Sequence, residues 1–493
     1  MKSGTRNLII VAVGVAVLGG LVAVLQTTGK TEDASSSSAE VSSAIQLVSK
    51  KRENVVSMKV TNAKGSYTLI PEKKKAAQAS SGSASSAASE ETTYTVEGFR
   101  NVPINTTETS SVIESGVSLI ASKDLGSVSS LEDYGLKNPQ ATVDVSFQDG
   151  SSYHYKIGKT SATDQSAYYM CGTDSDHVYL VSVDSGLFES GTYFVNKSLT
   201  AIGTTDSSGN SNAASLFTKI ALSGKNYAQN IVMSMKDDAM KITVPEEYDV
   251  NSTKLSAVET ALSSLSADTV EAVNPDAAAL KTYGLDNPTA VVTFTADKKN
   301  YKLTAGAKKD GNYYVMFDGV DAVYGISASK VSEWAEADLF AFRNRMIYLP
   351  YIETVQSFTI TVGDQTNELN LTRTKDESKS TQDKPAYTYK LTGNGGKTLD
   401  YENNYKYFYQ TAIGVQILEP ADKIPEGKPA LTYEYRYFDK STVDTVQFIK
   451  SADRRYTVVF NGKPFGIVTQ DDIDAVTESL NLLESGKTVP QPA

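Results

Sequence analysis

The side chains that most often perform chemistry are scarce in this sequence. Two histidines, His154 and His177, fall on neighbouring predicted strands near Asp174 and Asp176. Two imidazoles and a carboxylate can bind a metal ion or transfer protons. In a similar stretch further along the chain, Lys302 and apolar residues occupy the matching positions, so the fold does not depend on the histidines. We therefore predict no catalytic, cofactor-binding or metal-binding residue, and a protein that is not an enzyme.

Two short motifs resemble catalytic signatures but lack their required partners. Gly158-Lys159-Thr160 looks like the end of a phosphate-binding loop, yet Tyr153 stands where that motif needs a glycine. Ser327-Ala-Ser-Lys330 has the Ser-x-x-Lys spacing of penicillin-recognising enzymes, but no Ser-Asp-Asn follows. We predict a turn for the first motif and a helix N-cap for the second. Cys171 has no basic neighbour in sequence to lower its pKa, which favours an inert thiol.

Tyrosine is unusually abundant, with 28 Tyr against 15 Phe. Tyr401, Tyr405 and Phe408 share one face of a predicted helix. Tyrosine combines apolar area with a hydrogen-bonding tip, which suits surfaces that bind sugars or proteins. The alternation of predicted strands, in which Tyr433 occupies the position of Val143, favours a core role instead. Both interpretations stay open.

The charge balance excludes one class of partner. The chain has 58 acidic and 47 basic residues, a formal net charge of -11, so nucleic-acid binding is not expected. Arg343-Asn-Arg345 is predicted to be a solvated helix end. A single cysteine allows no internal disulfide. The length of 493 residues and the hydrophobic share of 40% predict roughly three folded domains.

The N-terminus carries an apolar segment. Leu8 to Leu25 is uncharged and would form about 27 Å of helix, close to the thickness of a bilayer core. Lys2 and Arg6 precede it, which places the short N-terminus in the cytoplasm and the rest of the chain outside. No small-x-small cleavage site follows at Leu25, so an uncleaved anchor is favoured over a signal peptide. The predicted localisation is the cell membrane, single-pass and largely extracytoplasmic.

A repeated motif organises the remainder. Leu131 to Pro139 recurs as Leu280 to Pro288, and an alternating strand follows each proline and also follows Pro429. Further strand-like runs and tight-turn dipeptides predict four-stranded antiparallel meanders, each preceded by a hairpin and closed by a helix. The predicted fold class is α+β: an N-terminal transmembrane helix followed by three tandem repeats, each an antiparallel β-meander with packed helices.

The predicted domains follow from these patterns and from Ser-rich stretches that read as a stalk, a disordered insertion and a linker. They are a cytoplasmic tip and anchor over 1–30, a stalk over 31–44, unit 1 over 45–203 with an insertion at 76–89, a linker over 204–212, unit 2 over 213–350, a divergent unit 3 over 351–485, and a tail over 486–493.

The N-terminal apolar segment is followed by copies of the motif Tyr-Gly-Leu-x-x-Pro. After each copy come an alternating strand, a turn and a strand that contains Tyr-Tyr. The Tyr-Tyr pairs are Tyr168-Tyr169 and Tyr313-Tyr314. This arrangement resembles the bacterial proteins that carry the domain of unknown function 4340. The resemblance covers most of residues 45–345 and, more weakly, the remainder, where Tyr-Gly-Leu is missing. It implies membrane-anchored, extracytoplasmic proteins that are often encoded near ABC-type permeases, and it supplies no catalytic or binding residue.

Three functional hypotheses follow. The leading one is a membrane-anchored extracytoplasmic scaffold or interaction protein, an accessory of an ABC-type transporter or of an envelope complex. Its expected partners are the membrane, through residues 8–25, and an ABC-type permease or envelope proteins, with no nucleic acid and no assigned small-molecule ligand. The second is a module that binds cell-wall glycan or another polymer through tyrosine-rich sheet faces. The third is a hydrolase that uses His154 or His177.

Overall fold

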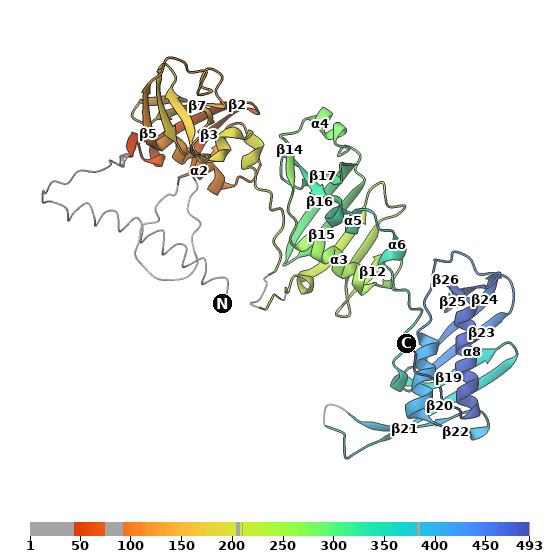
Figure 1. The fold of residues 1–493 in the computed structure, drawn as a ribbon. Helices are drawn as coiled ribbons and strands as arrows, with labels where there is room; N and C mark the ends of the chain where they lie inside the picture. The colour runs from red at the N-terminus through yellow and green to blue at the C-terminus, as the bar shows by residue number, and fades with distance from the viewer. Residues whose placement is uncertain (1–43, 74–91, 204–207, 210, 382–384, 493) are drawn as a thin grey trace.

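Three antiparallel sheets, each with its own buried core, follow one another along the chain (Figure 1). The structure is a computed structural model that describes residues 44–73, 92–203, 208–209, 211–381 and 385–492. The sheets contain nine, nine and eight strands. Helices are few among the described residues, and most of them are short.

The first sheet has the strand order β1-β5-β9-β8-β7-β6-β2-β3-β4. In the interior of this sheet β2 pairs with β6, where Val60 lies opposite Val143 and both side chains are fully buried. The helix α2 (Thr106–Val117) contacts β4 and β5, and buries Val112 and Ile113. The strands are β1 (Ile45–Ser49), β2 (Val55–Asn62), β3 (Gly65–Lys73), β4 (Thr92–Val96), β5 (Ser118–Ser127), β6 (Ala141–Phe147), β7 (Ser152–Thr160), β8 (Tyr168–Gly172) and β9 (His177–Val181).

The second sheet has the order β13-β12-β11-β10-β15-β16-β17-β18-β14. The core side chains include Trp334, which the helix α5 contributes. The strands are β10 (Phe217–Ser223), β11 (Ile231–Lys236), β12 (Ala239–Val244), β13 (Tyr248–Asp249), β14 (Thr269–Val273), β15 (Ala290–Ala296), β16 (Lys299–Lys309), β17 (Asn312–Phe317) and β18 (Ala322–Ser327). The helices are α3 (Ser252–Ser263), α4 (Ala277–Thr282), α5 (Ala328–Ala335) and α6 (Leu339–Phe342).

The third sheet has the order β22-β21-β20-β19-β23-β24-β25-β26, and tyrosines fill its core. Phe358 on β19 stacks on Tyr435 on β23 with ring centroids 4.5 Å apart. The strands are β19 (Val355–Val362), β20 (Gln365–Lys375), β21 (Tyr387–Thr392), β22 (Thr398–Leu399), β23 (Pro429–Tyr437), β24 (Val443–Ala452), β25 (Arg455–Phe460) and β26 (Lys463–Thr469). The helical elements are the single π-turn η7 (Tyr401–Tyr405), α7 (Lys406–Ile413) and α8 (Gln470–Ser485).

The Tyr-Gly-Leu motif contacts the backbone of a neighbouring strand. The carbonyl of Tyr134 accepts a hydrogen bond from the backbone N–H of Lys159 at 3.0 Å. A Cβ atom at Gly158 would lie 2.2 Å from that carbonyl, so only glycine fits there. Tyr283 and Gly306 repeat this contact in the second sheet, again with a 2.2 Å approach. The resemblance of residues 158–160 to a phosphate-binding loop therefore comes from a strand whose glycine admits a neighbouring carbonyl.

The predicted α+β class is wrong. The described chain is mostly antiparallel strand, and α2 ends at Val117, where the chain continues directly as β5. Short 3-10 turns, η2 (Ser185–Phe188) and η3 (Gly191–Phe194), follow the first meander where a closing helix was expected. Strand alternation indicates a half-buried strand, but it does not say how many strands join one sheet.

The prediction of three tandem repeats is also wrong. The third sheet has one strand fewer than the other two, and the sheets differ at their edges: β1 and β5 extend the first, β14 extends the second, and no described strand pairs in the same way beyond β26. No helix among the described residues is long and apolar enough to cross a membrane. The predicted transmembrane segment 8–25 and the predicted insertion at 76–89 lie outside those residues, as does the predicted stalk over 31–44 up to residue 43.

Candidate functional site

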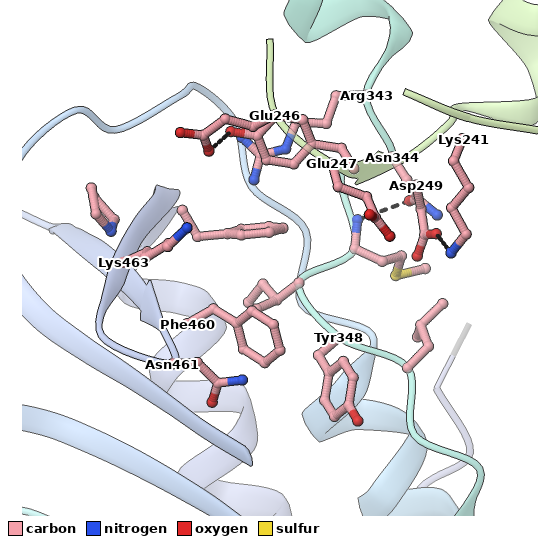
Figure 2. A pocket seen from close by; sticks show the side chains of 16 residues that line it. Lys241, Glu246, Glu247, Asp249, Arg343, Asn344, Tyr348, Phe460, Asn461 and Lys463 are labelled. Carbon is pink, nitrogen blue, oxygen red and sulfur yellow. Dashed lines mark hydrogen bonds and ion pairs between the residues drawn. The ribbon is translucent and has the colours of Figure 1, made fainter. Parts of the chain in front are cut away.

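A cavity of about 500 Å³ lies between the second and third sheets (Figure 2). The β12–β13 edge of the second sheet forms one side, and the turn between β25 and β26 forms the other. The segment that follows α6 passes between them. The side chains that line it include Lys241, Glu246, Glu247, Tyr248, Asp249, Arg343, Tyr348, Phe460, Lys463 and Phe465.

Local structure fixes Arg343 at the start of this segment. The side chain of Asp338 caps α6 by accepting a hydrogen bond from the N–H of Ala341 at 2.8 Å. The helix ends at Arg343, whose backbone is extended and forms a β-bridge with Val250. The next N–H, that of Asn344, donates to the carbonyl of Asp249 at 2.7 Å. The backbone of Arg343 is therefore attached to the edge of the second sheet.

The guanidinium of Arg343 contacts two aromatic rings that belong to different sheets and that also contact each other edge to face, with centroids 6.5 Å apart. Its Cζ atom is 4.0 Å from the ring centroid of Tyr248 and 3.9 Å from that of Phe465. Such cation–π contacts are attractive, and more so when water is excluded. Only 5% of Arg343 is exposed. Burial lowers the pKa of this guanidinium, while Tyr248 and Glu246 act in the opposite direction.

Two donors of Arg343 are unsatisfied. Nε and Nη2 are buried, and neither has a hydrogen-bond partner among the described residues. These two N–H groups lie on one edge of the planar guanidinium, which is the edge that binds a carboxylate or phosphate through two parallel hydrogen bonds. A buried N–H without a partner costs roughly 1–3 kcal/mol, and more for a charged group.

The carboxylates around the cavity are already engaged. Lys241 donates to Asp249 at 2.5 Å, as Figure 2 shows, and the hydroxyl of Tyr248 donates to Glu246 at 2.9 Å. Glu247 pairs with Lys236 at 2.5 Å. The arrangement can therefore bind an oxyanion. It offers no nucleophile and base in contact, so binding is the chemistry that it supports.

The two histidines do not come together. The strand β8 separates β7, which carries His154, from β9, which carries His177. Nδ1 of His154 is 2.7 Å from Asp144, and Nε2 of His177 is 2.5 Å from Asp124. The prediction that the two histidines fall on neighbouring strands is thus wrong. The described residues contain no group of three or more His, Cys, Asp or Glu side chains that could hold a metal ion.

One histidine has the order of contacts found in a hydrolase triad. Nε2 of His154 lies 3.0 Å from Oγ of Ser152, and its other nitrogen faces Asp144. The side chains of His154 and Asp144 are 49% and 43% exposed on an open sheet face. Acyl transfer needs donors aimed at a developing oxyanion in a water-excluded site. This open face does not provide that enclosure.

The remaining predicted candidates have structural surroundings. Cys171 is buried, and burial raises the pKa of its thiol while Lys156 lowers it. Lys330 donates to Oγ of Ser266 at 3.1 Å, and Ser327 begins α5 without a side-chain capping bond. Four tyrosines of the third sheet region are core residues: at most 2% is exposed at Tyr405, Tyr409, Tyr433 and Tyr435.

The sequence pattern missed the central residue of the cavity. Arg343-Asn-Arg345 was predicted to be a solvated helix end, which is correct for the exposed Arg345 and wrong for Arg343. Its two aromatic neighbours are distant in sequence, since Tyr248 precedes it and Phe465 belongs to the third sheet. No local signal distinguishes the two arginines.

These features define a β-rich protein of serial antiparallel sheets with a cavity between two of them. The family described as Domain of unknown function (DUF4340) matches residues 95–271 and 241–408, which together span more than half of the chain. The protein belongs to this family. The family matches twice, and the two matches overlap, in contrast to the three separate copies expected from the sequence. No curated protein and no solved structure matches the chain.

Proposed function

We propose that this chain is a non-enzymatic interaction protein that acts outside the cytoplasm and holds a partner in the cavity between its second and third sheets. The observation that carries the proposal is the buried guanidinium of Arg343, which lines this cavity with two donors unpaired. Binding sites occur preferentially at interfaces between domains and combine aromatic walls with a few polar groups. Tyr248, Phe465 and Arg343 form such a combination.

The class of partner comes from the family resemblance. An ABC-type permease or another envelope protein is the partner that we propose. Glycan binding through tyrosine-rich faces has less support, because the tyrosines of the third sheet fill its core. A pull-down on isolated cell wall separates the two hypotheses, since an interaction protein of this kind stays in the supernatant.

Site-specific crosslinking tests the proposal. A photoreactive amino acid replaces Lys463, at the cavity, in one variant, and the exposed Lys59 of the first sheet in a control. After illumination of intact cells, we expect a permease or envelope protein to be captured from position 463 and not from position 59. Capture of neither class from position 463, with both variants folded, would contradict the proposal.

The location outside the cytoplasm needs a separate test. A cysteine at Ser83 in a Cys171→Ser background is exposed to a membrane-impermeant maleimide on intact cells. We expect labelling before lysis. Labelling that appears only after lysis would place this part of the chain in the cytoplasm and remove the extracytoplasmic part of the proposal.

A further inference from the structure

We propose that the cavity between the second and third sheets binds a singly charged carboxylate through the Nε and Nη2 edge of Arg343, and that binding opens this junction. The inference rests on the proposed function, because it names the chemistry by which a partner is held. It starts from the two buried donors of Arg343, which have no hydrogen-bond partner among the described residues. A carboxylate satisfies both donors at once.

The charges around Arg343 favour a single negative charge on the ligand. Glu246 lies close enough to act on the pKa of Arg343, and Glu247 and Asp249 also line the cavity. A dianionic phosphate would meet repulsion from these three carboxylates, whereas a carboxylate brings the smallest charge that still uses both donors. Lys463 has no carboxylate partner among the described ion pairs and lies on the same rim.

The walls of the cavity suit a ligand with an apolar body. Tyr348 and Phe460 pack with ring centroids 5.0 Å apart, and Phe465 lies 6.2 Å from Phe460. All three rings line the cavity. A carboxylate attached to an aromatic or aliphatic group would place the charged end at Arg343 and the apolar end against these rings. The C-terminus or an acidic side chain of a polypeptide has this chemistry, and so does a small aromatic acid.

Access to the donors requires the junction to move. Tyr248 belongs to the second sheet and Phe465 to the third; both rings contact the guanidinium, and they also contact each other edge to face with centroids 6.5 Å apart. The two donors are buried in this closed arrangement. A ligand that pairs with them therefore binds better to a state in which the rings separate, and it shifts the population toward that state.

Titration calorimetry on the purified full-length protein tests the site. The probe is 3-phenylpropionate, with inorganic phosphate in a second titration. We expect the Arg343→Met variant to bind the acid at least tenfold more weakly than the wild type. Arg343→Lys should also bind more weakly, because an ammonium does not form the side-on pair. The matched control, Arg345→Met, changes the exposed neighbour and should leave the affinity unchanged.

Three outcomes would overturn the inference. The first is equal affinity of wild type and Arg343→Met, or no binding to either when both melt at the same temperature. The second is phosphate binding as tight as that of the acid. The third is binding with no change in the distance between spin labels placed at Lys219 and Lys450, which we expect to lengthen. A failed titration leaves the crosslinked partner test intact, so the two proposals can fail separately.

Discussion

At the first junction, the chain that leaves the first sheet enters the core of the second, whereas at the second junction two rings from different sheets contact one arginine. Val195 and Ile202 belong to the core of the second sheet. Between them, the hydroxyl of Thr200 donates to the carbonyl of Leu262 at 2.7 Å and accepts from the N–H of Leu265 at 2.8 Å. The first junction is thus satisfied in both its apolar and its polar groups.

The second junction is less complete. Ile347 reaches the core of the third sheet, and the N–H of Ile417 donates to the carbonyl of Arg345 at 2.9 Å. Beside these contacts lie the cavity and the unpaired donors of Arg343. A junction whose buried polar groups are all hydrogen-bonded resists opening. A junction with unpaired buried donors is stabilised by a ligand that forms hydrogen bonds with them. The difference predicts a fixed first junction and an adjustable second one.

The largest effect is expected from Thr200→Val at the first junction. The variant leaves the carbonyl of Leu262 and the N–H of Leu265 without their partner in a buried site, which costs about 2–4 kcal/mol. Hydrogen exchange of residues 196–202 and 262–265 should become faster by the corresponding factor. Thr218→Val, at an exposed position on β10, is the control. Unchanged exchange would mean that the first junction is not held in this way.

The free energy of unfolding should depend on pH through Glu259, by up to about 3 kcal/mol. This residue is on α3 beside the first junction and is 6% exposed. Burial raises the pKa of this carboxyl to about 7. The folded state therefore holds a proton that the unfolded chain releases at lower pH, so stability is full below pH 4.5 and falls as the pH rises to about 7. Urea unfolding at pH 5 and pH 8 should show this loss, and Glu259→Gln should abolish it. The control variant Glu478→Gln, at an exposed position on α8, should keep the pH dependence.

A smaller loss in the free energy of unfolding, about 1 kcal/mol, is expected from Asn274→Gly at the surface of the first junction. The side chain of Asn274 donates to the carbonyl of Gly98 at 2.8 Å and accepts from the N–H of Arg100 at 3.3 Å. Its backbone has a φ of 48°, so Asn274→Gly removes these bonds without strain. Asp237→Gly, with a φ of 50°, controls for the flexibility of glycine. The melting temperatures of both variants measure this effect. Equal decreases for Asn274→Gly and Asp237→Gly would mean that the Asn274 hydrogen bonds do not stabilise the chain.

The smallest effect is expected from Arg343→Met at the second junction. Methionine keeps contact with the rings of Tyr248 and Phe465 and removes two unpaired donors, so the free energy of unfolding should change by less than about 1 kcal/mol. Urea unfolding measures it beside Arg345→Met. A loss as large as that of Thr200→Val would break the comparison, because the second junction would then depend on its arginine for stability.

The local patterns of the sequence predicted individual strands better than whole sheets. Val143 and Val145 alternate with polar neighbours and are buried on β6 as expected. Thr469 and Asp472 form the capping box that begins α8. By contrast β5 was missed, because its residues continue the pattern of the preceding helix and pair with a strand far along the chain. Pairing partners at long range decide sheet size, and alternation carries no information about them.

The candidate site was less predictable than the fold, since it depends on three residues from separate segments. Arg343 gains its role from Tyr248 and Phe465, and neither ring is a sequence neighbour. The histidines illustrate the opposite error. They were placed on neighbouring predicted strands, but β8 lies between the strands that carry them.

One interior strand pair of each sheet has a consequence for synthesis of the chain. Val60 pairs with Val143, Ile220 with Phe294, and Phe358 with Tyr435. The early hairpin of each sheet therefore cannot complete its pairing until a strand far along the chain has been synthesised. Contacts of such long sequence separation form slowly and leave unpaired edges exposed in the meantime. Each sheet therefore folds only after its own meander has been synthesised, in the order first, second, third. A pause in elongation within a meander would prolong the interval in which that sheet is open to aggregation.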